Sequence, residues 1–230
     1  EGRDDVTASG RLDPATGALQ ARIEARGVDL AALPGRVRRM TGIALEPGLL
    51  PGGIADLDAT VSGTLAAPVA DVRFALRDAS YGAMKDLALS ARVRLGDPVA
   101  RLEADVTWSH GSRLDIALDA PIKVGWESDE AGRALRFGID RAAPFRLSAT
   151  LAGVDLTGFR DLAGPAFRGL EGAVTGDFLL EGSLAEPRGR LRLRAARARL
   201  GSLRDIDADV DATLDADRTG PVQGRDADSQ

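Results

Sequence analysis

The chain has 230 residues, a formal net charge of -5, a single histidine and no cysteine. The lack of cysteine excludes a disulfide framework and a zinc site built from cysteine and histidine. The acidic balance gives no reason to expect nucleic acid or an anionic membrane surface as a partner, and no apolar run approaches the roughly 18 residues that span a bilayer.

The N-terminal part of the chain predicts a hairpin and then a connector. Alternating residues at 6–12 and 19–30 flank the sequence DPATG at 13–17, which has Pro near its start and Gly at its end, as turns do. Residues 30–53 are rich in Pro and Gly, and we expect one or two helical turns there that pack apolar side chains onto a neighbouring surface. Because Glu1 is not a start methionine, we expect the chain to be a piece of a longer protein, with targeting signals outside it.

Residues 55–154 predict strands in near-unbroken succession. Apolar residues alternate there with Asp, Arg, Ser and Thr, and a period of two places the two sets on opposite faces of a strand. His110-Gly111 is interpreted as a turn and residues 128–132 as a polar loop. The apolar stripes in chain order are Leu57, Ala59, Val61 and Leu65; Val72, Phe74 and Leu76; Leu87, Leu89, Val93 and Leu95; Leu102, Ala104, Val106 and Trp108; Leu114, Ile116 and Leu118; Ile122, Val124 and Trp126; Leu135, Phe137 and Ile139; and Phe145, Leu147, Ala149 and Leu151.

Residues 157–171 predict a second connector, in which Thr157 caps a short helix and Gly164-Pro165 ends it. Residues 172–214 then predict three consecutive strands. A turn near Gly201 joins the second of these strands, where arginines alternate with apolar residues, to the third, where aspartates do so. We expect the arginines and aspartates to face each other and to neutralise each other on the outer face. The apolar residues of the three strands are Val174, Phe178, Leu180 and Leu184; Leu191, Leu193 and Ala195; and Ile206, Ala208, Val210, Ala212 and Leu214.

The unit formed by these strands also occurs 119 residues earlier, without a gap. The sequence GTLAAP at 63–68 matches GSLAEP at 182–187, and GVDL at 27–30 recurs at 153–156 with an offset of 126. A fixed internal period indicates a repeat architecture. We therefore predict a single repetitive β-groove domain over residues 1–217, with repeat units at about 19–97 and 145–216 and a disordered tail at 218–230.

The pattern predicts an all-β protein in which about twelve strands pair antiparallel into one long sheet with an apolar and a polar face. The apolar face must be covered, either by closure into a barrel, by a second sheet, or by a sheet that curls along its length and leaves a groove. The apolar residues are mostly Leu, Val and Ala, and aromatic residues make up 4% of the chain. We favour the curled groove, because this modest lining suits a space that another molecule fills.

We expect the apolar stripes to line this groove collectively. Twelve strands about 4.8 Å apart give a groove roughly 55 Å long, which holds several acyl chains end to end. Trp108 and Trp126 end two of the stripes, and we expect them to be core residues. The predicted lining residues are Val61, Val72, Phe74, Leu76, Leu87, Leu89, Val93, Leu102, Val106, Leu114, Ile116, Leu118, Phe137, Leu147, Leu151, Phe178, Leu180, Leu191, Leu193, Ile206 and Val210.

Three other features have a plainer explanation than a functional site. Ser109 and His110, with Asp105 nearby, fall at a turn without the pocket that a catalytic triad needs, so we expect a turn histidine. The aspartates of 205–217 resemble a calcium loop but have no glycine at its sixth position, so we expect a solvated face. The arginines of 188–199 lack interleaved aromatic residues for base stacking. We expect no catalysis, no metal and no cofactor, because no acid–base pair or phosphate-binding loop is found.

The repeated signature G-[TS]-L-A-x-P, at residues 63–68 and 182–187, is followed in each copy by an alternating strand, a turn with Gly and a strand that opens with Asp-Leu or Asp-Ile. This arrangement resembles the TamB family, within the wider AsmA-like group of bacterial envelope proteins, over most of residues 6–216. The resemblance implies a β-taco, which is a curled sheet with a hydrophobic groove, in the Gram-negative periplasm, with an inner-membrane anchor outside this chain. It also implies a bridge role in moving phospholipid towards the outer membrane, and a second role in outer-membrane protein assembly with the barrel partner TamA.

We therefore expect a non-catalytic segment of a lipid conduit in the periplasm. Its partner would be a phospholipid or another acyl-chain lipid, and contacts with a TamA-like barrel would come from regions outside this chain. A second hypothesis is a chaperone-like module whose sheet edges pair with strands of outer-membrane clients. A third is a structural spacer. A single Leu→Ala change in the groove should do little, whereas one buried charge there should block passage.

Overall fold

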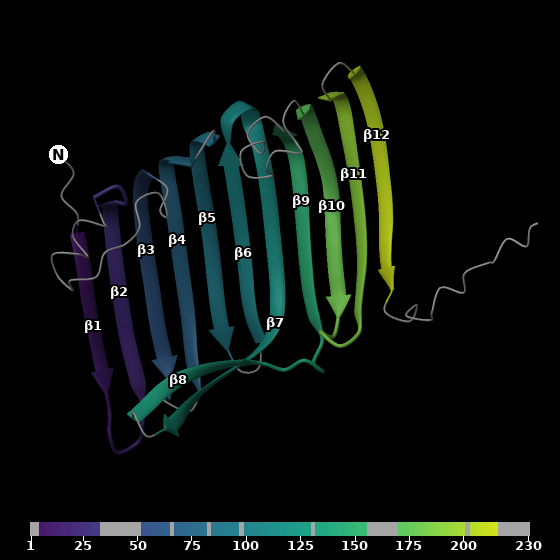
Figure 1. The fold of residues 1–230 in the computed structure, drawn as a ribbon. Coiled ribbons are helices and arrows are strands. Elements are labelled where there is room, and N and C mark those ends of the chain that lie inside the picture. The colour runs from purple at the N-terminus through teal and green to yellow at the C-terminus, as the bar shows by residue number, and fades with distance from the viewer. Residues whose placement is uncertain are drawn as a thin grey trace, which may run out of the picture.

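The computed structural model describes residues 5–32, 52–64, 67–81, 84–96, 99–129, 132–155, 170–200 and 203–215. These residues form twelve antiparallel strands of one sheet, as the alternation predicted, and no α-helix occurs among them (Figure 1). The helical turns and the disordered tail expected from the sequence fall outside the described residues. The strands are β1 (Asp5–Leu12), β2 (Leu19–Asp29), β3 (Gly52–Gly63), β4 (Pro68–Tyr81), β5 (Met84–Gly96), β6 (Val99–Trp108), β7 (Ser112–Asp129), β8 (Gly132–Ile139), β9 (Phe145–Asp155), β10 (Leu170–Gly182), β11 (Pro187–Leu200) and β12 (Leu203–Asp215).

The sheet order departs from the chain order at β8. The strands run from β1 to β7 and then from β9 to β12, while β8 pairs with β7 off this path. The expectation of separate strands at 114–118 and 122–126 is wrong, because β7 continues through both as one strand of 18 residues. Its first half pairs with β6 and β9, and its second half with β8. The change of partners occurs at Pro121, which has no N–H to donate to a ladder, and the β7–β8 hairpin extends sideways from there (Figure 1).

Each copy of the G-[TS]-L-A-x-P signature builds the same tight turn between two strands. In the first copy the Ala67 N–H donates to the Thr64 carbonyl at 3.2 Å and to the Thr64 hydroxyl at 3.1 Å. In the second copy the Glu186 N–H donates to the same two groups of Ser183, at 3.2 and 3.0 Å. The glycine that opens each copy has a positive φ, +99° and +109°, and a Cβ there would lie 2.5 or 2.6 Å from a carbonyl oxygen. Glycine permits this close approach, and the hydroxyl supplies a second acceptor.

The irregularities that bend the strands recur at the sequence offset of 119. A β-bulge shifts the register of β4 against β5 after Leu76, and the same shift occurs between β11 and β12 after Ala195. On the partner strands, Asp86 and Asp205 both have a positive φ, +52° and +55°. Because a bulge bends a strand and increases its local twist, the two halves of the sheet bend at equivalent points.

Two glycines mark equivalent close crossings of neighbouring strands. Gly53 in β3 has a φ of +135°, and Gly172 in β10 has a φ of +125°. A Cβ on Gly53 would lie 2.7 Å from the Cβ of Ala79, and a Cβ on Gly172 would lie 2.8 Å from the Cα of Ala198. Both alanines are buried. The glycine on one strand and the alanine on the next therefore let the backbones approach beside each bulge.

Burial in the described part of the chain is shallow and depends on small side chains. Most of the buried hydrophobic residues there are alanines, and the exceptions are Leu76, Val154 and Trp108, of which the sequence predicted Trp108 as a core residue. Because an alanine side chain removes little apolar area from water, each of these positions stabilises the fold only modestly. The one core cluster seen among the described residues consists of Ala55, Leu76 and Ala79, with Leu30, Phe74, Leu87 and Leu89 packed against it.

Ser112 is a fully buried polar residue that ties β7 to β9. Its hydroxyl donates to the Gly153 carbonyl at 3.2 Å and accepts from the Asp155 N–H at 3.1 Å.

We predict that Ser112→Ala lowers the free energy of unfolding by about 1–3 kcal/mol, because it leaves a buried donor and acceptor unsatisfied. Urea unfolding followed by circular dichroism measures the effect, with Ser9→Ala on the exposed strand β1 as control. Equal unfolding midpoints for the two variants would contradict this role.

Candidate functional site

The register of the sheet joins the predicted apolar stripes into continuous rows that run from strand to strand. Residues directly opposite on antiparallel strands have Cβ atoms about 4.5–5.5 Å apart, so members of a row are in contact distance. None of the residues in these rows is charged. The first row is Ala59, Val72, Val93, Leu102, Leu118, Leu147 and Leu180; the second is Leu57, Phe74, Ala91, Ala104, Ile116, Ala149, Phe178 and Leu191; the third is Ala55, Leu76, Leu89, Val106, Leu114, Leu151, Gly176, Leu193 and Val210; and Val61 begins a shorter row with Ala70, Leu95, Ala100 and Ala120.

This apolar face is defined by the four rows, and the strands that carry them belong to one open path of paired strands, with β8 paired to β7 off that path. Its larger side chains are mostly half-buried. Exposure is greatest towards the two ends of the sheet, where Val6 on β1 is 64% exposed and Leu214 on β12 is 54% exposed. The face is therefore a wide apolar surface that its own strands leave partly open to solvent.

The structure places nearly all the predicted lining residues on this face. Leu87 and Ile206 lie beside the two bulges, where Leu87 is directly opposite Ala79 and Ile206 is directly opposite Ala198. Phe137 lies in β8 and Trp126 lies in β7, and both belong to a stretch whose side chains the structure does not describe. Leu184, expected to continue the stripe of β10, instead lies in the turn after Gly182 and is 47% exposed, because the signature turn already begins there.

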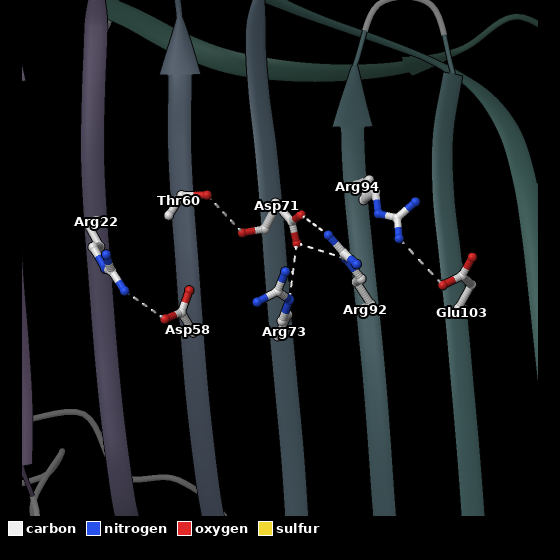
Figure 2. Close-up of polar contacts among 8 residues, drawn as sticks. All are labelled: Arg22, Asp58, Thr60, Asp71, Arg73, Arg92, Arg94 and Glu103. Atoms are coloured by element: carbon white, nitrogen blue, oxygen red, sulfur yellow. Dashed lines mark hydrogen bonds and ion pairs between the residues drawn. The ribbon is translucent and has the colours of Figure 1, made fainter.

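The opposite, polar face is covered by ion pairs between neighbouring strands (Figure 2). Asp71 on β4 accepts two hydrogen bonds from the guanidinium of Arg92 on β5, one of them at 3.1 Å. This charged pairing lowers the pKa of Asp71. Arg22 on β2 reaches Asp58 on β3 at 3.2 Å. Basic and acidic side chains of neighbouring strands thus neutralise each other in pairs on this face.

The predicted facing of arginines and aspartates on β11 and β12 is confirmed. Arg192 lies directly opposite Asp211, and Arg194 lies directly opposite Asp209. Arg190 donates to Asp211 at 3.2 Å, and this hydrogen bond is the main cause that lowers the pKa of Asp211. The arginine stripe is therefore neutralised by the neighbouring strand, which explains why the two runs of opposite charge follow each other in the sequence.

A carboxylate pair on the polar face was not predicted. Asp105 on β6 lies directly opposite Asp115 on β7, and Arg113 contacts both carboxylates at 2.8 Å. Burial and the hydrogen bond with Asp115 raise the pKa of Asp105, whereas the hydrogen bond from Arg113 lowers the pKa of Asp115. A turn centred on residue 110 places residues 105 and 115 opposite each other, so the position of the turn was the signal that reveals the pair.

These opposite shifts give opposite contributions to stability. The lowered pKa of Asp71 and Asp211 stabilises the fold above about pH 3.8, and this contribution is lost as the pH falls through their folded values. The raised pKa of Asp105 works in reverse, because its contribution is present below pH 3.8 and is lost as the pH rises.

We predict that Asp105→Asn raises the melting temperature at pH 7 by about 1–3 °C and that the gain disappears near pH 3. Thermal scans at both pH values check this, and a lower melting temperature at pH 7 would contradict it.

The turn between β6 and β7 has the structural role expected of it. Ser109, His110 and Gly111 form a single 3-10 turn, η1 (Ser109–Gly111). The Ser109 hydroxyl donates to the Lys85 carbonyl at 2.8 Å and accepts from the Lys85 N–H at 3.3 Å, which anchors the turn to β5. In the part of the chain that the structure describes, no group of three or more possible ligand side chains is arranged to hold a metal ion.

No family model matches the chain, and no curated protein or solved structure is significantly similar to it. None of the described segments is a helix long and apolar enough to cross a membrane.

Proposed function

We propose that this chain is a periplasmic segment of a lipid conduit, of the kind found in the TamB family, and that phospholipid acyl chains lie along its apolar face. The observation that supports this proposal is the continuity of the apolar rows. The second row passes from Leu57 on β3 to Leu191 on β11 through directly opposed residues, none of them charged. A conduit needs this continuity, because a charge in the path would be desolvated by every passing acyl chain.

A groove shape for this surface is part of the same proposal. The equivalent bulges after Leu76 and Ala195 add twist at corresponding points of the two halves. Repeated bending in one sense curls a long sheet, and the face inside the curl becomes a trough. An open trough also agrees with an apolar face whose buried residues are mainly alanine, since small side chains leave width for a guest.

The energetics of such a surface favour a lipid that slides. Each buried methylene contributes about 0.8 kcal/mol, so an acyl chain is held strongly by area alone. No directional hydrogen bond from the apolar rows fixes the chain at one position. Neighbouring rows have similar composition, so the free energy of a bound chain changes little as it moves from one strand to the next.

Native mass spectrometry of the purified protein tests the proposal. We expect phospholipid to co-purify with the protein. We also expect the protein to exchange lipid between vesicles that carry a fluorescent phospholipid. Binding of an amphipathic strand peptide without lipid would favour the alternative of a chaperone that pairs with client strands at the sheet edges. If the protein binds neither phospholipid nor the strand peptide, the conduit proposal is overturned, and a structural spacer becomes the remaining explanation.

A further inference from the structure

Within the described residues the sheet ends at β1 on one side and at β12 on the other (Figure 1). Natural sheets protect such edges with prolines, bulges or rows of charge, because the unpaired N–H and C=O groups of an edge can pair with another strand. β1 has none of these devices, because all eight of its residues are exposed, it contains no proline, and it pairs with β2 from end to end without a register shift. Its outer edge is therefore open to a further strand.

The side chains of β1 carry one charge of each sign. Asp5 and Arg11 lie near the two ends of the strand, and alternation places both on the polar face. Arg11 lies directly opposite the neutral Gln20, so β2 offers it no counter-charge directly across the ladder. Asp5 lies directly opposite Arg26, whose guanidinium is 3.7 Å from Glu24. Arg11 and Asp5 can therefore each pair with an opposite charge from a strand on their outer side.

A second copy of the chain can join this edge in one way that keeps the pattern of the sheet. β1 and β12 run in the same direction (Figure 1), so a copy placed by translation would pair them parallel, whereas neighbouring strands of this sheet are antiparallel. A two-fold axis perpendicular to the sheet instead brings β1 beside β1 of the second copy, antiparallel, and leaves the apolar faces of both copies on the same side. This contact is isologous, so the edge must be complementary to itself.

The edge of β1 is complementary to itself, and that of β12 is not. When the axis passes through Ala8, Asp5 of each copy lies directly opposite Arg11 of the other, so an ion pair can form at each end of the contact. The pairs between these ends are Thr7 with Ser9 and Val6 with Gly10. An axis one residue away loses both ion pairs. The same symmetry at β12 would set the aspartates of residues 205–215 against aspartates, which is unfavourable.

We propose that two copies of this chain pair through β1 about a two-fold axis at Ala8, so that their sheets form one continuous sheet. Each edge then satisfies the outer N–H and C=O groups of the other. Val6, which is 64% exposed, comes to lie opposite Gly10 of the partner subunit, where the absence of a side chain leaves room for it. Eight residues from each copy make a small contact, so we expect a weak dimer. The interface lies at the edge of the sheet and does not rest on the proposed conduit.

Sedimentation velocity from micromolar to millimolar protein concentration tests the dimer through an exchange of charges. We expect the unaltered chain to dimerise reversibly. Asp5→Arg and Arg11→Asp should each weaken the dimer about tenfold, because either change sets like charges opposite each other twice. An equimolar mixture of the two variants should form a heterodimer as tight as the original dimer, because their charges are complementary. Glu186→Arg, an equal change of charge in the exposed turn before β11, should have no effect. Circular dichroism of each variant checks that the sheet is intact.

Cross-linking tests the register, because the chain has no cysteine of its own. Ala8→Cys should form a disulfide between two copies on mild oxidation, since residue 8 lies opposite itself at the axis. Val6→Cys, on the same face, should cross-link several-fold more slowly. Three results would overturn the dimer: monomers at every concentration, a mixture of the charge variants no tighter than either variant alone, and equal cross-linking at the two positions. A strand peptide that binds this edge while the chain stays monomeric would also overturn it, since the edge then receives other chains.

Discussion

Replacing Gly53 with alanine is expected to lower the free energy of unfolding by about 2–5 kcal/mol. Two causes add here. The φ of +135° belongs to a region that L side chains rarely adopt. The new Cβ would also lie 2.7 Å from the Cβ of Ala79 and 2.9 Å from the carbonyl oxygen of Arg77, and backbone atoms cannot move aside as a flexible side chain can. Urea denaturation measures the change in midpoint.

The neighbouring glycine is a matched control for this prediction. A Cβ on Gly52 would meet only the hydroxyl of Ser80, at an ordinary 3.7 Å, and Gly52 has no positive φ, so Gly52→Ala should change stability little. Gly172→Ala should destabilise about as much as Gly53→Ala, because its φ and its crowding against Ala198 are equivalent. If the Gly53 and Gly52 variants unfold at the same midpoint, the close crossing is not a requirement of the fold.

Ile116→Asp is expected to abolish most lipid binding by the protein. Ile116 lies near the middle of the second apolar row, between Ala104 and Ala149. A charged side chain at the centre of an apolar phase costs about 2.5–3.5 kcal/mol, which corresponds to a loss of roughly 100-fold in affinity for an acyl chain that must pass it. The amount of phospholipid that co-purifies, and the rate of transfer between vesicles, measure the effect.

The next residue in the same strand separates a blocked path from a disturbed fold. Ala117 is exposed and lies on the polar face, opposite Glu103 and Ser148, so Ala117→Asp should leave bound lipid unchanged. Leu118→Ala, which stays in the first apolar row without adding a charge, should reduce binding only slightly. If Ile116→Asp and Ala117→Asp retain the same lipid, acyl chains do not travel over this face.

The two faces of the sheet impose different demands on sequence. On the apolar face the requirement is collective, because any aliphatic residue preserves the row. On the polar face the requirement is pairwise, because Asp71 needs Arg92 and Asp211 needs Arg190 across a strand boundary. Substitutions should therefore be tolerated singly on the first face and in compensating pairs on the second.

Much of the fold could be predicted from the chain alone. Period-two alternation from Val6 to Leu214 determined the all-β class, the antiparallel pairing and which side chains share a face, because successive residues of a strand must point to opposite sides. The two signature copies marked equivalent positions of the chain, although Leu184 was expected to continue a strand and lies in the turn after Gly182. The runs of arginine and aspartate on residues 188–199 and 205–217 also predicted their own pairing, since a short turn makes two consecutive strands neighbours in the sheet.

The tertiary structure alone decided how far each strand continues and with which partner. Local alternation is identical in a strand that ends at residue 120 and in one that runs on, so the length of β7 and the displacement of β8 from the sheet path depend on which edges are free to pair. Register likewise brought Ile116 on β7 opposite Ala149 on β9. No turn joins these two strands directly, and only the ladder of hydrogen bonds between them sets which residues meet.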